Sequence, residues 1–169
     1  MLIVASRGTS FTAKIIKFFT KYLLTHFALR FNENYNSGML HSETGGVQET
    51  TWDKYQARFK DSVFWEVNIG VAEEALSNIK SKIQGKPYDY LALYSLGIIV
   101  LLRKIGFKIY NNKLGNKQRF MCSEVIIELI EECKKLDTTL NLETLNSEIS
   151  TIKDIVEYLD RYPHYFKRV

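Results

Sequence analysis

Residues 23–43 read LLTHFALRFNENYNSGMLHSE. Residues 23–31 alternate: Phe27, Leu29 and Phe31 point one way and His26, Ala28 and Arg30 the other, which is the period of a β-strand. An Asn-rich polar segment at 32–38 follows, and its composition is typical of a turn. Residues 39–43 then return as a second strand, so the whole stretch predicts an antiparallel β-hairpin.

The hairpin carries two of the chain's three histidines. If the strands pair symmetrically about residues 33 and 34, His26 faces His41 across the hairpin and Ala28 faces Met39. The two histidines then share one face, with Cβ atoms about 4.5–5.5 Å apart, and Ala28 leaves space there for another element. A slip of one residue would move His41 to the other face. The alternative is therefore two unrelated polar residues on a half-exposed sheet.

Cys122 opens the segment CSEVIIELIEECKK, for which apolar spacing predicts a helix over 122–135. The N-terminus of a helix presents unpaired N–H groups and positive potential. Both would lower the pKa of a thiol below its usual value of about 8.5. A thiolate there can attack a carbonyl carbon while the same N–H groups hold the oxyanion. The alternative is a buried small apolar residue, which is how we interpret Cys133.

A cysteine nucleophile needs a base, and a second polar group must orient that base. His26 and His41 are the candidates for these two roles. The third histidine, His164, lies in a terminal aromatic stretch and is expected to pack or to face solvent.

The remaining chain predicts strands at 2–6, 62–67 and 164–169, and helices at 10–22, 51–59, 71–83, 88–105 and 151–159. Strands concentrate in the first 70 residues and helices in the second half. We therefore expect residues 1–169 to form one α+β domain, with a small antiparallel sheet packed against helices. The apolar run at 90–102 is too short to span a bilayer and predicts a mostly buried helix.

Composition narrows the class of protein. An apolar fraction of 46% and a charged fraction of 25% exclude a disordered chain and a disulfide scaffold. The net charge of +4 comes from scattered Lys and Arg, so no nucleic-acid partner is expected. Two cysteines three turns apart on one helix, with three histidines, suit neither a disulfide nor a structural zinc site. We expect no metal or cofactor, no signal peptide and no membrane span, which indicates a cytoplasmic or virion-associated protein.

The order of three motifs resembles the circularly permuted papain-like hydrolases of the NlpC superfamily. These motifs are THFAL at 25–29, LHSE at 40–43 followed by GGV, and MCSEVI at 121–126. The family includes YiiX-like bacterial amidases and relatives of lecithin:retinol acyltransferase. The resemblance covers about residues 2–130 and implies a permuted papain-like fold with the nucleophile at a helix N-terminus. Residues 136–169 match nothing in the family and are interpreted as a C-terminal extension.

The resemblance also assigns roles. It implies that Cys122 is the nucleophile, His26 the base and His41 the orienting residue, with Glu43 as a fallback orienter. The stretch GKPYD at 85–89 resembles a family motif and places Tyr88 and Asp89 near the site, while Ser123 directly follows the nucleophile.

The expected function is a thiol peptidase or amidase that cleaves an amide, isopeptide or cell-wall peptide bond through a thioester. One alternative is a lipid acyltransferase or phospholipase-like enzyme that uses the same residues, with the 90–102 helix and the basic stretch 103–117 at a membrane surface. We favour the other interpretation, in which residues 90–102 form a buried helix and residues 103–117 a solvated loop. A second alternative is a catalytically silent structural or binding module, such as a phage or viral component. The acyltransferases carry the motif N-C-E, whereas this chain has MCSE at 121–124, and this difference favours an amidase. His41 favours the acyltransferases instead.

Overall fold

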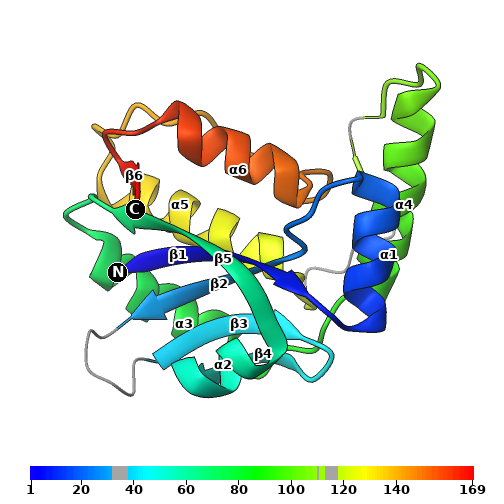
Figure 1. Cartoon of the computed structure of the whole chain (residues 1–169). Helices are drawn as coiled ribbons and strands as arrows, with labels where there is room; N and C mark the ends of the chain where they lie inside the picture. Colours follow the sequence, from blue (N-terminus) through cyan, green and yellow to red (C-terminus); the bar gives the residue numbers. More distant parts are fainter. Residues whose placement is uncertain (32–37, 110, 113–117) are drawn as a thin grey trace.

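The computed structural model describes residues 1–31, 38–109, 111–112 and 118–169. At its centre lies a six-stranded antiparallel sheet in the order β4-β3-β2-β1-β5-β6 (Figure 1). The strands are β1 (Leu2–Gly8), β2 (His26–Phe31), β3 (Gly38–Glu43), β4 (Gly46–Thr51), β5 (Phe59–Val67) and β6 (Phe166–Arg168). The helices are α1 (Phe11–Thr20), α2 (Trp52–Arg58), α3 (Ala72–Ile83), α4 (Tyr90–Lys104), α5 (Cys122–Leu136) and α6 (Ile152–Arg161). The expected α+β class is confirmed.

The two faces of the sheet pack against different helices. Phe27 and Leu29 of β2 point into the larger core, which they share with α3, α5 and α6. Ala28 points to the opposite face, into a smaller core with Tyr55 of α2 and Phe59 at the start of β5. The alternation predicted for this strand is therefore present. Residues 136–169 supply α6 and β6, which complete the larger core and one edge of the sheet.

The register of the β2–β3 hairpin differs from the symmetric pairing. Ala28 lies opposite His41, and Arg30 lies opposite Met39. The shift is two residues, an even number, so His26 and His41 stay on the same face as diagonal neighbours. The prediction that they face each other directly is wrong, because the connection is longer than the symmetric turn assumed. The turn at 32–37 lies outside the described residues.

Strand β4 was not predicted, because Gly45-Gly46 suggested the end of a strand. Thr44 and Gly45 instead form a two-residue turn, since Glu43 pairs with Gly46 in the register. The new strand is fixed on its outer side by the segment before α4. The N–H of Val47 donates to the carbonyl of Lys86, and the N–H of Gly85 donates to the carbonyl of Val47, both at 2.8 Å. The turn thereby holds Glu43 and the end of β3 against the 85–88 segment.

Replacement of Gly46 by alanine is expected to destabilise the fold by at least about 1–2 kcal/mol. Gly46 has a φ of +98°, which disfavours any residue with a Cβ, and that Cβ would collide with the Lys86 carbonyl oxygen. Gly45→Ala is the matched control, because a Cβ there meets its nearest neighbour, Gln48, only at 3.8 Å. Urea denaturation followed by circular dichroism measures both variants. Equal midpoints for the two would contradict this account of the turn.

Helix α4 lies beside α1 at one end of the molecule (Figure 1). It was expected to be mostly buried, and that prediction is wrong for one of its faces. The inner face packs closely on α1, where a Cβ at Gly97 would come within 2.7 Å of the Phe19 ring. The exposed face carries large apolar side chains because no described element covers it; they are Leu91, Tyr94, Ile98, Leu101 and Ile105. Among the described helices, none combines the length and apolarity needed to cross a membrane.

Candidate active site

Cys122 is the first residue of α5, as its motif predicted. Its side chain is 3% exposed and lies in the larger core. Backbone hydrogen bonds reach the sulfur from Phe27, from Ser123 and from Cys122 itself. The thiol therefore lies against the backbone of the residue that follows His26. Cys133 is buried on the same helix, and both cysteines are free.

At the Cys122 thiol, burial outweighs the pKa-lowering effect of the helix terminus. Burial raises this pKa to about 11, although the three backbone hydrogen bonds act in the opposite direction. The expectation of a preformed thiolate is wrong, because desolvation of the charged form outweighs the helix N-terminus. At neutral pH the group is a thiol.

Alkylation by iodoacetamide is expected to report this raised pKa. In a Cys133→Ser background, the rate at Cys122 should rise with an apparent pKa near 11 in the folded protein. In urea the value should return to about 8.5. An apparent pKa below 8 in the folded protein would contradict burial as the dominant influence.

His26 and His41 are joined by a hydrogen bond of 3.0 Å between His26 Nε2 and His41 Nδ1. Both side chains are buried, at 6% and 2% exposure. The imidazole of His26 is stacked on the Phe59 ring at 4.1 Å between centroids, with an interplanar angle of 11°. That contact fixes the ring plane of His26, so His41 and Phe59 together hold the imidazole in one orientation.

Both imidazoles are neutral at physiological pH. Burial lowers the pKa of His41 to about 4, and the positive charge of Arg58 adds to this effect. Burial and the neighbouring His41 lower the pKa of His26 well below its usual value. Among the described residues, His41 Nε2 is a buried nitrogen without a hydrogen-bond partner. A neutral imidazole can accept a proton, which is what a general base requires.

We expect the His41 pKa to make the protein sensitive to acid. Between pH 6.5 and about 4, the unfolded chain binds a proton at His41 that the folded chain does not, so stability falls as the pH falls. Relative to His41→Gln, wild type should lose up to about 3 kcal/mol over this range. The comparison with His41→Gln is needed because Glu124 has the opposite effect on stability. Burial raises the pKa of Glu124 to about 7, so this group stabilises the folded protein as the pH falls. Urea unfolding across the range measures it, and a constant difference would contradict the prediction.

The secondary candidates divide into two groups. The Glu43 carboxylate pairs with Arg58 at 2.7 Å, whereas His41 is hydrogen-bonded to His26. Asp89 caps α4 by accepting the Ala92 N–H at 2.9 Å. Tyr88 and Ser123, in contrast, line the same pocket as Cys122.

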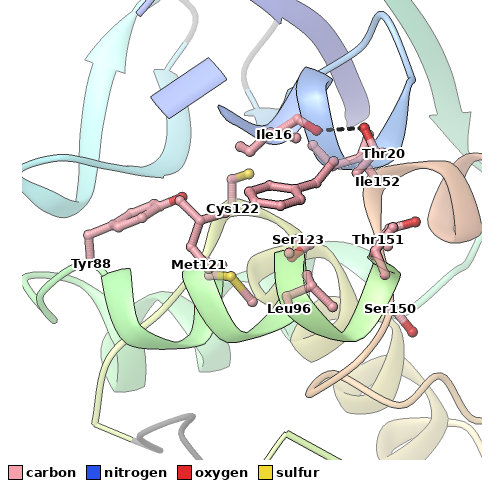
Figure 2. A pocket seen from close by; sticks show the side chains of 14 residues that line it. Ile16, Thr20, Tyr88, Leu96, Met121, Cys122, Ser123, Ser150, Thr151 and Ile152 are labelled. Atoms are coloured by element: carbon pink, nitrogen blue, oxygen red, sulfur yellow. Dashed lines mark hydrogen bonds between the residues drawn. The ribbon is translucent and has the colours of Figure 1, made fainter. Parts of the chain in front are cut away.

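Several of the candidate residues line two pockets that share part of their lining. The first contains Cys122, and part of its lining is formed by apolar side chains of α1 and α4. The second contains His26, Ser42 and Glu43. Ile16 and Tyr88 line both pockets and so lie at their boundary. Figure 2 shows the side chain of Tyr88 directed toward Cys122.

The aromatic side chains that support the histidine pair were not predicted from the sequence. The Tyr55 hydroxyl donates to Ser6 Oγ at 3.0 Å, and the Ser6 and Ser62 hydroxyls lie 2.7 Å apart. The Tyr55 ring is stacked on Phe59, which in turn is stacked on His26. The spacing of Tyr55 and Phe59, four residues apart across the end of a predicted helix, was the available signal.

The described residues do not suit a metal centre. Nowhere in the described part of the chain do three or more His, Cys, Asp or Glu side chains gather in a way that could hold a metal ion. The facing nitrogens of His26 and His41 are already joined to each other by a hydrogen bond.

The fold is similar to that of a solved bacterial protein. The crystal structure of the metalloprotein YiiX from Escherichia coli O157:H7, DUF1105, matches with a TM-score of 0.65 at 15% sequence identity. The match covers 99% of this chain and 94% of that one, so the chain has a YiiX-like fold. No family model matches the sequence, and no curated protein matches it.

Proposed function

We propose that this protein is a thiol hydrolase of the permuted papain-like type, with Cys122 as nucleophile, His26 as general base and His41 as positioning residue. The observation that carries the proposal is a helix-terminal cysteine whose thiol lies against the backbone of Phe27, the residue that follows His26, together with the hydrogen bond between His26 and His41. The YiiX-like fold is consistent with it.

The histidine pair supports this proposal through its tautomers. When the His26 Nε2–H donates to His41 Nδ1, His26 Nδ1 is unprotonated and can take the thiol proton. His41 then carries its own proton on the buried Nε2, which lacks a partner among the described residues. In the opposite tautomer, His26 carries its proton on Nδ1 and cannot act as a base. An unpartnered His41 Nε2–H destabilises the first tautomer by about 1–3 kcal/mol. Substrate that hydrogen-bonds to this N–H, or opens it to water, would therefore favour the tautomer in which His26 can act as a base.

The proposed reaction is transfer of an acyl group to sulfur followed by hydrolysis. His26 Nδ1 takes the proton from Cys122 as the sulfur attacks the carbonyl carbon. The backbone N–H of Cys122 donates to the oxyanion, and the intermediate collapses to a thioester as His26 returns the proton to the leaving amine. His26 then takes a proton from water as the water oxygen attacks the thioester carbonyl carbon; the C–S bond breaks, the acid is released, and His26 returns the proton to the Cys122 sulfur. An amide is the proposed substrate class.

A chromogenic ester tests the nucleophile directly. Incubation with p-nitrophenyl acetate should add one acetyl group to Cys122, detected by intact mass and removed by hydroxylamine, which cleaves thioesters. Cys122→Ala should abolish this adduct, whereas Cys133→Ala should leave it unchanged, because Cys133 is buried in the core away from both pockets. Absence of acetylation in wild type would overturn the proposal and favour the catalytically silent module.

The lipid acyltransferase is the second candidate function. The observation that favours it is the apolar lining that α1 and α4 give to the Cys122 pocket, which suits an alkyl chain. Acetyl and decanoyl p-nitrophenyl esters separate the two candidates. A large preference for the decanoyl ester supports a lipid donor, and equal rates or an acetyl preference support the amidase.

A further inference from the structure

The outer face of α4 is an unusual surface for a globular protein. Its exposed side chains are 44–71% accessible and follow one another at spacings of three and four residues; they are Leu91, Tyr94, Ile98, Leu101 and Ile105. This spacing places them along one continuous stripe of the helix. Phe107, 60% exposed, follows just beyond the helix. We call these six residues the α4 stripe.

The charged side chains on the α1 and α4 helices themselves have a single sign. The chain has 19 Asp and Glu residues, but none lies in residues 9–31 or 90–109, the segments that contain α1 and α4. The same two segments carry seven Lys and Arg residues. Lys104 and Lys108 are exposed at the C-terminal end of the stripe, and the Lys104 ammonium donates to the Phe19 carbonyl at 3.0 Å. That bond joins the C-terminal ends of α4 and α1.

We propose that the α1–α4 pair docks this protein on anionic membranes, with the α4 stripe lying in the lipid interface and the lysines on lipid headgroups. An apolar helix face on a helix whose own charged residues, Arg103 and Lys104, are all cations is the pattern of an interfacial helix. A second copy of the chain fits less well, because a self-complementary dimer would bring the same cations of both copies together. The α4 helix has 15 residues, which suits a position along the surface rather than across it.

Docking through α1 and α4 would also place the Cys122 pocket close to the membrane, because the inner faces of these helices line that pocket. Ile16 and Phe19 of α1, with Leu96 and Val100 of α4, line the pocket that contains Cys122 (Figure 2). The docked protein would hold this pocket within one helix diameter of the bilayer surface. The docking itself does not depend on the thiol chemistry, so it can be tested whether or not Cys122 is a nucleophile.

Vesicle flotation tests the proposal. Wild type should float with vesicles of 70% phosphatidylcholine and 30% phosphatidylglycerol, bind pure phosphatidylcholine at least about tenfold less, and lose binding in 0.5 M NaCl. Ile98→Ser with Ile105→Ser should reduce binding about tenfold without changing the charge. Val169→Ser, at a residue 63% exposed and remote in sequence from both helices, is the matched control.

The lysine contribution has its own matched pair. Lys108→Glu and Lys54→Glu change the net charge equally, but Lys54 lies on α2. Only Lys108→Glu should weaken flotation, by about fivefold or more. Failure of wild type to float, equal binding to both vesicle types, or equal effects of the two lysine variants would overturn the proposal. So would a dimer in light scattering that the Ile98 and Ile105 substitutions dissociate, because the stripe would then be a self-interface.

Discussion

Replacement of His26 by glutamine is expected to slow acetylation of Cys122 by p-nitrophenyl acetate about 10²–10⁴-fold at pH 7. The pKa of the Cys122 thiol is raised to about 11, so less than about one molecule in a thousand carries a spontaneous thiolate at that pH. A neutral imidazole is the group that can remove the proton as the sulfur attacks. The p-nitrophenolate leaving group needs no proton, so the loss would report thiol deprotonation alone.

The pH profile separates a missing base from a damaged fold. At pH 10–11 hydroxide removes the thiol proton, so the rate of His26→Gln should approach that of wild type. A collapsed site would remain slow at every pH. His164→Gln is the matched control, because His164 is exposed and belongs to neither pocket. A His26→Gln rate within threefold of wild type at pH 7 would exclude His26 as the base.

The parts of the fold that were predictable from sequence are those with a local cause. The alternation around Phe27 and Leu29 is present because one face of β2 meets a core rich in large side chains. The start of α6 was predictable because Thr151 and Asp154 form a capping box, in which each side chain accepts the other's backbone N–H. Cys122 at the first position of α5 was likewise readable from its motif.

The features that were not predictable depend on contacts between distant segments. The hairpin register follows from a connection whose length the composition did not fix, and β4 is held by hydrogen bonds from the 85–86 segment. The pKa of Cys122 was expected to fall because the sequence shows the helix N-terminus but not the burial. The sequence of α4 predicts a buried helix on both faces. Apolar composition alone does not show whether another element will cover a given face.

Trp65→Ala is expected to destabilise the protein by about 3–5 kcal/mol and to lower Tm by about 6–20 °C. Trp65 lies on β5 with its side chain fully buried in the larger core. Its indole N–H donates to Asp160 Oδ1 of α6 at 2.8 Å, and Arg168 of β6 lies over its ring at 5.6 Å. One side chain therefore joins the sheet to the C-terminal helix and strand, and its removal leaves both a cavity and an Asp160 carboxylate without this donor.

The other tryptophan provides the comparison that isolates burial. Trp52 begins α2, is only partly buried, and is stacked on Tyr55 with Arg30 over its ring at 4.6 Å. Trp52→Ala should therefore cost clearly less than Trp65→Ala, although the two substitutions remove the same atoms. Trp65→Phe keeps most of the packing and loses the indole N–H, so it should cost about 1–2 kcal/mol. If Trp65→Ala were no more destabilising than Trp52→Ala in urea unfolding followed by circular dichroism, α6 and β6 would not depend on Trp65 for their attachment to the sheet.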